Sequence, residues 1–301
     1  MLAKIAILFS VEILLVLVCG RNMAQTRSDK VFIFYESSPS TNFRDIEGES
    51  NIARNYEVAL GAPPIKISPK LKWINTVYSR SVRYNFQDLP AALSSLSSDL
   101  YDIQYGSIFL YDFQNPKWSL LASPRLMLRS DFKDNNLGNS LFLSGLVLVN
   151  YNPDGQEKLT WSFGVTLTND FNRNLVIPVA GFIYKDQRFT IEVTYPRVNF
   201  LYKPKPAIEW GVTASVIGGI YNTSSLQLPD GSSTSYTRAI NVLVGHTFNY
   251  LVSERIVLNT CLGYMPVRNY DLMNQDFEAV KSVTTDLNQS VFLRTGLSIR
   301  F

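Results

Sequence analysis

The sequence predicts an all-β protein, a closed antiparallel transmembrane β-barrel of about 12 strands, within a range of about 10–14. Three observations predict this fold class. Polar and apolar residues alternate with a period of two in runs of roughly ten residues. Clusters of turn-forming residues separate these runs. Aromatic residues, which favour strands, make up 13% of the chain, while charged residues make up only 18%.

The alternation is clearest at the C-terminus, where one face of the final run is apolar and the other is largely polar. The apolar face consists of Val291, Leu293, Thr295, Leu297, Ile299 and Phe301. Similar runs span 159–168, 188–195, 208–220 and 256–264. A shift of one residue would place Arg and Glu side chains on the apolar side, so the register of each strand is strongly specified.

Turn-forming residues and longer polar stretches divide the chain into these strands. Hairpin connections are predicted at Asn115-Pro116, Asn152-Pro153-Asp154-Gly155, Asn172-Arg173-Asn174, Lys185-Asp186-Gln187 and Lys203-Pro204-Lys205-Pro206. Two longer stretches, 222–235 and 269–288, are predicted to be surface loops. The barrel is expected to span 54–301. The polar segment 25–53 is interpreted as a tail, a plug or an additional strand.

Residues 1–24 have the features of a secretory signal peptide. Lys4 gives a positive start, an apolar stretch runs from Ile5 to Val18, and Gly20 and Ala24 are small residues near which cleavage could fall. An uncleaved anchor is disfavoured because the apolar run is shorter than the roughly 20 residues that a membrane span requires. Lipid attachment at Cys19 is also disfavoured, since Val18 precedes it where such sites carry a small residue.

Two features favour a membrane barrel over a soluble sandwich. The apolar faces end in aromatic residues, as expected for girdles at the two membrane interfaces. These residues are Tyr84, Phe86, Tyr101, Tyr111, Tyr195, Tyr221, Phe248, Tyr250, Tyr264 and Phe301. The polar faces are rich in Ser, Thr, Gly, Arg and Glu, which suits a wet interior. A closed barrel also leaves no unpaired strand edge in hydrocarbon.

Two parts of the sequence resemble known outer-membrane proteins. The final run, Leu293 to Phe301, resembles the C-terminal signal by which outer-membrane barrels are recognised for assembly. The segments Ile177-Pro178-Val179-Ala180-Gly181-Phe182 through Tyr195-Pro196, Tyr202-Lys203-Pro204 and Gly218-Gly219-Ile220-Tyr221 are similar to a functionally uncharacterised barrel family of Bacteroidota. The resemblance implies the fold and an outer-membrane location, and it supplies no catalytic residues.

Five charged residues are the candidate functional residues, because the alternation directs them all into the barrel. They are Arg188, Glu192, Glu209, Arg294 and Arg300. One interpretation is a charged constriction that selects solutes. The other is a set of ion pairs that fills the interior and holds the barrel rigid.

Other candidate sites are weaker. His246, the only histidine, lies in line with apolar residues and is expected to face lipid. Asp131, Asp134, Asn135 and Asn136 lack the spacing of a calcium loop and indicate a solvated turn. Cofactors and metals are therefore not expected.

The expected role is passive, either a narrow or plugged channel (a possible porin) or a structural barrel that presents loops. The alternative is a lipid-modifying or proteolytic barrel enzyme with loop carboxylates such as Asp271 or Asp276 in its site. After signal-peptide cleavage, the protein is expected in the outer membrane of a Gram-negative cell. Its expected partners are outer-membrane lipid and the barrel-assembly machinery, the latter through the strand ending at Phe301. A net charge of +3 does not indicate nucleic-acid binding.

Overall fold

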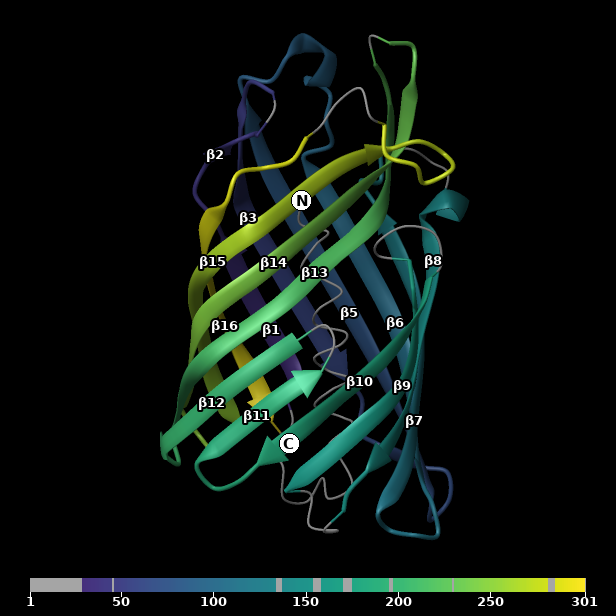
Figure 1. Ribbon diagram of the computed structural model, residues 1–301, viewed down its shortest axis with the longest axis vertical. Helices are drawn as coiled ribbons and strands as arrows, with labels where there is room; N and C mark the ends of the chain where they lie inside the picture. The colour runs from purple at the N-terminus through teal and green to yellow at the C-terminus, as the bar shows by residue number, and fades with distance from the viewer. Residues whose placement is uncertain are drawn as a thin grey trace.

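In the computed structural model, the described residues form one closed antiparallel barrel of 14 strands (Figure 1). They are residues 29–300 without 45, 134–136, 154–157, 170–174, 195–196, 229 and 281–284. The all-β closed barrel is confirmed, and the count is 14 rather than about 12, at the upper limit of the expected range. The predicted signal peptide 1–24 and Phe301 lie outside the described residues.

The wall strands follow one another around the barrel in chain order. They are β1 (Asp29–Ser37), β3 (Glu49–Gly61), β5 (Leu71–Gln87), β6 (Asp99–Asp112), β7 (Trp118–Ser130), β8 (Leu141–Tyr151), β9 (Leu159–Thr168), β10 (Leu175–Lys185), β11 (Phe189–Thr194), β12 (Arg197–Lys205), β13 (Ile208–Gln227), β14 (Ser233–Leu251), β15 (Ile256–Met273) and β16 (Ser290–Arg300). Short strands β2 (Thr41–Asn42) and β4 (Ile65–Lys66) pair with β3 and β5. The 3-10 helices η3 (Ala91–Leu93) and η4 (Leu137–Ser140) lie in connections.

The barrel closes through β1, which pairs with both β16 and β3. Strand β1 lies within the segment 25–53, so this part of the segment belongs to the wall. Asp29 is the register partner of Arg300, which places both ends of the described chain at one rim. We call this the terminal rim and the opposite one the loop rim. The connections that carry η3 and η4, and the ends of the strands that flank the β1–β3, β13–β14 and β15–β16 connections, lie at the loop rim.

The predicted alternation of faces is confirmed along the strands. On β9, Trp161, Phe163 and Val165 are exposed outward, while Ser162 and Thr166 are buried inside. The same alternation holds in β16, where Leu293 and Leu297 are exposed and Arg294 and Ser298 are buried. Apolar side chains therefore cover the outside, and polar side chains line much of the inside.

Aromatic residues form a girdle on the outside near the terminal rim. Ring centroids lie 4.5 Å apart in Trp118–Tyr151, 5.3 Å in Trp161–Phe182 and 5.1 Å in Phe189–Tyr202. Such rings, with an apolar body and a polar edge, are typical of a membrane interface.

The aromatic residues expected at the other interface behave differently. Tyr84 and Tyr221 are 1% and 0% exposed, and they lie inside the barrel near the loop rim. Phe86 shares the inward face of β5 with Tyr84 and stacks on it, at 5.4 Å between ring centroids. The expectation that these three residues face lipid is therefore wrong. Beyond the hydrocarbon, an aromatic side chain gains more from packing inside the mouth than from exposure to water.

The two predicted surface loops are shorter than expected. Strand β13 continues to Gln227 and β14 begins at Ser233, so most of 222–235 is strand. Strand β15 extends to Met273, within the predicted loop 269–288. At the end of β13, Asn222 and Thr223 are polar on opposite faces, and both are buried and hydrogen-bonded, to Ser140 and Thr237. The polar composition of 222–235 and 269–288 therefore did not show where these strands end.

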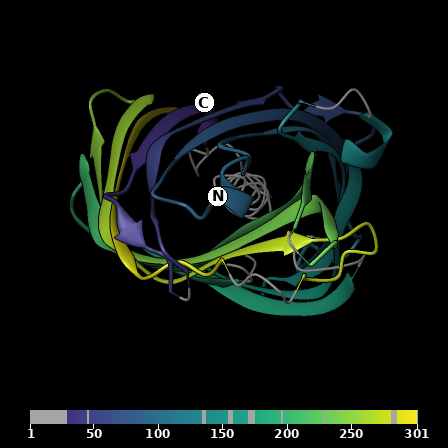
Figure 2. The ribbon, with the colours of Figure 1, turned by 90° about the horizontal axis from the view of Figure 1, so that it is seen from above.

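The wall differs in height around the barrel. Strands β13, β14 and β15 have 20, 19 and 18 residues, whereas β11 has 6 and β12 has 9. Above these short strands, β13 reaches across to β7, where Asn222 pairs with Ser130 in parallel orientation. In the view from above, the connection that carries η3 reaches inward from the wall (Figure 2). No helix in the described part of the chain is long and apolar enough to cross a membrane.

Candidate functional site

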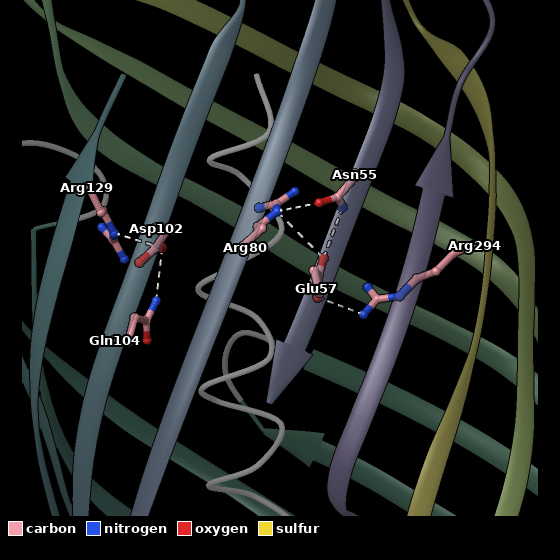
Figure 3. A network of polar contacts seen from close by, with 7 residues as sticks. All are labelled: Asn55, Glu57, Arg80, Asp102, Gln104, Arg129 and Arg294. Atoms are coloured by element: carbon pink, nitrogen blue, oxygen red, sulfur yellow. Dashed lines mark hydrogen bonds and ion pairs between the residues drawn. The ribbon is translucent and has the colours of Figure 1, made fainter. Parts of the chain in front are cut away.

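A row of alternating charges crosses four neighbouring strands on the inside of the barrel. Arg129 on β7 is the register partner of Asp102 on β6, which is also the partner of Arg80 on β5. Arg80 is in turn the partner of Glu57 on β3. Directly opposed residues on antiparallel strands lie about 4.5–5.5 Å apart at Cβ, so opposite charges attract along the whole row. Figure 3 shows these side chains together on the inner surface.

Glu57 joins the row to β16. Its Oε2 lies 3.1 Å from Nη2 of Arg294, and its Oε1 lies 3.7 Å from Nε of Arg80. Asn55 donates from Nδ2 to Oε1 of Glu57 at 3.1 Å and accepts from Nε of Arg80 at 2.9 Å. The Glu57 carboxylate therefore neutralises two guanidinium groups, that of Arg80 on β5 and that of Arg294 on β16.

Asp102 forms the second centre of the row. Nε of Arg129 donates to its Oδ2 at 3.1 Å, and Nε2 of Gln104 donates to the same oxygen at 2.9 Å. The guanidinium of Arg129 also lies over the ring of Tyr221, 5.9 Å from its centroid. A charge removed from water is costly unless it is paired and hydrogen-bonded, and these contacts supply both forms of compensation.

An aromatic cap covers part of the inside near the loop rim. Its members come from strands that are not neighbours: Tyr84 and Phe86 lie on β5, and Tyr270 lies on β15. The Tyr270 ring meets Tyr84 and Phe86 edge-on, at 5.6 and 5.8 Å between centroids. Phe43 stacks on Phe86 at 6.2 Å. Because β16, β1 and β3 separate β15 from β5 in the wall, these contacts cross the interior.

Asp131 ties three segments together above the cap. Its Oδ2 accepts from Oγ of Ser97 at 2.5 Å, and from N and Oγ of Ser224 at 2.8 and 2.9 Å. Ser97 belongs to the connection that carries η3, and Ser224 belongs to β13. Nδ2 of Asn222 donates to Oγ of Ser140 at 3.1 Å. The predicted turn at 131–136 thus includes a structural carboxylate, while 134–136 lie outside the described residues.

The five predicted residues do not form one constriction. Arg294 belongs to the charged row. Glu192 accepts from Nδ2 of Asn199 at 2.6 Å, and Glu209 lies 3.2 Å from Nζ of Lys203, both on the β11–β13 wall. Arg188 is exposed in the turn before β11, where its N–H donates to Asp186. The side chain of Arg300 lies outside the described residues.

Sequence reasoning missed Glu57, Arg80, Asp102 and Arg129. Each lies at an inward position of an alternating strand, which was a usable signal. What the sequence did not show was that they are register partners, since pairing depends on the exact lengths of the connections between β3, β5, β6 and β7.

The remaining candidates lie apart from the charged row. His246 is exposed on the outside of β14, as the alternation predicted. Asp271 accepts from Nε and Nη2 of Arg238 at 2.9 and 2.8 Å. Asp276 lies in the exposed 274–278 turn. Among the described residues, no group of three or more His, Cys, Asp or Glu side chains could hold a metal ion.

The geometry defines a β-barrel with an apolar outer surface and a charged, partly capped interior. The chain belongs to the family described as Domain of unknown function (DUF6268), whose model matches residues 24–300. No match to the sequence was found among curated proteins.

Several solved outer-membrane proteins are distantly similar. The COG4313 outer membrane channel from Pseudomonas putida F1 is 14% identical, with a TM-score of 0.48, covering 90% of this chain and 94% of that one. The P. putida toluene transporter TodX is 9% identical, with a TM-score of 0.39, covering 90% and 89%. The outer membrane phospholipase A from Escherichia coli is 8% identical, with a TM-score of 0.31, covering 94% and 97%.

Proposed function

We propose that the protein is a narrow, passive channel of the Gram-negative outer membrane. The observation that carries this proposal is the combination of a closed, outwardly apolar wall with the inward row of alternating charges from Arg129 to Glu57. A barrel that served only as an anchor could fill its interior with apolar side chains. The paired charges of the row, together with inward Ser, Thr and Asn side chains, instead make a polar interior, which suits polar solutes.

The aromatic cap makes the channel narrow. A barrel of this size lies between packed eight-stranded barrels and open porins of about 16 strands. Contacts of Tyr270 with Tyr84 and Phe86 cross the interior and reduce the free cross-section at the loop rim. The connection that carries η3 lies directly above, because Ser97 accepts from the Tyr270 hydroxyl at 3.4 Å.

The location and partners follow from the same proposal. The outer aromatic girdle and the exposed apolar band would contact outer-membrane lipid. Cleavage of residues 1–24 and recognition of the strand ending at Phe301 by the barrel-assembly machinery would complete export. The resemblance of the central segments to barrels of Bacteroidota supports a source in that group. The proposed role is therefore transport rather than catalysis.

Single-channel recording in a planar bilayer tests the proposal. The native protein should conduct in small steps, and Tyr270→Ala should increase the step size because it removes the ring that crosses the interior. Tyr264→Ala is the matched control, since Tyr264 is on the same strand but faces outward. Absence of conductance from all three proteins would refute the channel.

Cysteine labelling tests the orientation. If the terminal rim faces the periplasm, an impermeant thiol reagent on intact cells should label a cysteine at Ser233 or Gln275, at the loop rim. It should not label one at Ser253, at the terminal rim. Labelling at Ser253 alone would reverse the proposed orientation.

A further inference from the structure

The barrel wall has an interruption above the β11–β12 hairpin. Strand β11 pairs with β10 only from Phe182 to Lys185, and β12 pairs with β13 only as far as Ser215. Within the described part of the chain, residues 175–181 of β10 and 216–220 of β13 therefore have no strand partner on the sides that face each other. We call this interruption the side gap. Figure 1 shows β11 and β12 ending low on the wall while β13 continues to the loop rim.

Paired strands surround the side gap. Residues 175–181 remain paired with β9 on their other side, and 216–220 remain paired with β14. The gap ends above where Asn222 meets Ser130. Where both short strands are present, β10 and β13 are separated by three strand spacings, or about 14 Å. Pro178, which has no N–H to donate, lies on the β10 edge, and prolines within sheets are typical of such edges.

The outer flanks of the side gap are apolar. On the β10 side, Val176 is 67% exposed, and Val165 of β9 beside it is also exposed. On the β13 side, Val216 lies at the edge of the gap, and its register partner on β14 is Val242. These side chains belong to the same band that covers the rest of the barrel, so the gap opens towards lipid. Unpaired backbone cannot face hydrocarbon without a hydrogen-bonding partner, so water or the polar part of a bound molecule must reach it.

The inner surface beside the side gap is apolar too. Ile177 and Val179 lie on the inward face of β10, opposite Thr166 and Gly164. Val179 packs against the buried cluster that includes Leu146 and Leu148 of β8. The inner faces of β3, β5, β6 and β7 combine apolar side chains of that cluster with the charged row. An apolar surface therefore continues from the outside, past the edge of β10, to the inside.

Polar groups form the lower border of the gap. Asn199 of β12 donates to Glu192 at 2.6 Å and accepts from Oγ1 of Thr213 at 2.6 Å. Arg197, at the upper end of β12, is the register partner of Ser215. The gap thus combines apolar sides with a polar base, which matches a molecule that has an apolar chain and a polar head.

We propose that the side gap is a lateral portal through which an amphipathic molecule with an acyl chain passes between the barrel interior and the outer leaflet. This deepens the proposed channel function and rests on it, since it names the route and the class of solute. The aromatic cap restricts the axial path at the loop rim, whereas the side gap lies below it in the wall.

Spin labels on single cysteines test the portal, in a background in which Cys19 and Cys261 are replaced by serine. Ile177→Cys and Val179→Cys place labels inside, next to the gap. Ile108→Cys places one inside on β6, whose pairing with β5 is continuous, and Val165→Cys places one on the lipid-facing surface. Each protein is reconstituted in phosphatidylcholine vesicles, and label collisions with oxygen and with a water-soluble nickel chelate are measured. Heat-modifiable migration in gels verifies folding.

The labels at 177 and 179 should collide with oxygen almost as often as the label at 165, and the label at 108 should not. Added palmitic acid should then reduce label motion at 177 and 179 and leave 108 unchanged. Collisions with the nickel chelate alone would mean a water-filled opening and would overturn the portal. Spin–spin broadening between copies at 177 would mean that a strand of a second copy fills the gap, which also overturns it. These measurements need no conduction, so their failure is distinguishable from failure of the channel.

Discussion

Two parts of the barrel accommodate inward-facing side chains differently. We call them the tall wall, which runs from β16 through β1, β3, β5 and β6 to β7, and the low wall, which runs from β10 through β11 to β12. On the tall wall, the inner faces of β3, β5, β6 and β7 carry the charged row, in which buried charges such as Glu57 and Arg80 are register partners. On the low wall, β11 and β12 have only 6 and 9 residues, and β10 is apolar on both faces. Buried charges need fixed partners, and the pairing of long strands fixes them in register. On the short strand β11, Glu192 instead accepts a hydrogen bond from the neutral side chain of Asn199.

The largest effect is expected from breaking the charged row at its centre. Glu57→Gln leaves Arg80 and Arg294 facing a neutral amide, and both guanidinium groups are almost fully buried. Loss of one partner from a buried ion pair costs about 3–5 kcal/mol. The free energy of unfolding, measured by urea titration in vesicles, should fall by an amount in this range.

Glu192→Gln is the matched control on the low wall. Its partner is the neutral side chain of Asn199, so the change should cost about 1 kcal/mol, as for an ordinary hydrogen bond. Equal losses for the two variants would mean that the charged row contributes no more to stability than the low wall does.

These two glutamates also show how far the sequence could predict the interior. Period-two alternation placed Glu192, Glu209 and Arg294 inside correctly, because an error of one residue would have moved whole apolar faces into water. It failed for Arg188, since alternation has no meaning once the chain leaves the strand and enters a turn. The charged row could not be predicted. Residues such as Arg80 and Asp102 meet because their strands pair in one particular register, and that register cannot be deduced from the sequence.

The positions of aromatic residues predicted only one of the two membrane interfaces correctly. Near the terminal rim, Trp118 and Trp161 face outward, as a girdle requires. Near the loop rim, Tyr84 and Tyr221 turn inward, and the strands there run beyond the lipid. The sequence pattern of a strand is similar on both sides of the membrane boundary, so it does not show where lipid ends. The side gap could not be predicted, because the alternating run 188–195 does not show that the strand it forms, β11, ends at Thr194.

A medium effect is expected from charges placed on the two faces of β9. Val165→Arg puts a guanidinium against hydrocarbon and should cost about 2–4 kcal/mol near the midplane. Thr166→Arg points into the barrel beside the low wall and should cost less. Urea titration in vesicles compares the two free energies of unfolding, and the reverse order would mean that the inner and outer faces have been exchanged.

The smallest effect concerns the turn between β10 and β11, at the foot of the low wall. The Asp186 carboxylate accepts from the N–H groups of Phe189 at 2.6 Å and Arg188 at 2.7 Å, and from the Tyr184 hydroxyl at 3.2 Å. These bonds hold the pKa of Asp186 below its usual range. Its contribution to stability is therefore complete above the unfolded-state pKa, about 3.9, and is lost as pH falls through the lower folded-state value.

Asp186→Asn should accordingly speed amide hydrogen exchange at Phe189 at pH 7, without changing exchange in the charged row. The difference between variant and native protein should shrink only as pH falls through the folded-state pKa of the Asp186 carboxyl, which lies below the usual value of about 3.9. Asp112→Asn, at the same rim but on the tall wall, is the control and should leave exchange at Phe189 unchanged. Because β11 pairs with β10 over only four residues, a local change should stay local here. If exchange also became faster in β5 and β6, the stability of the tall wall would depend on the low wall, and the two walls would not be independent.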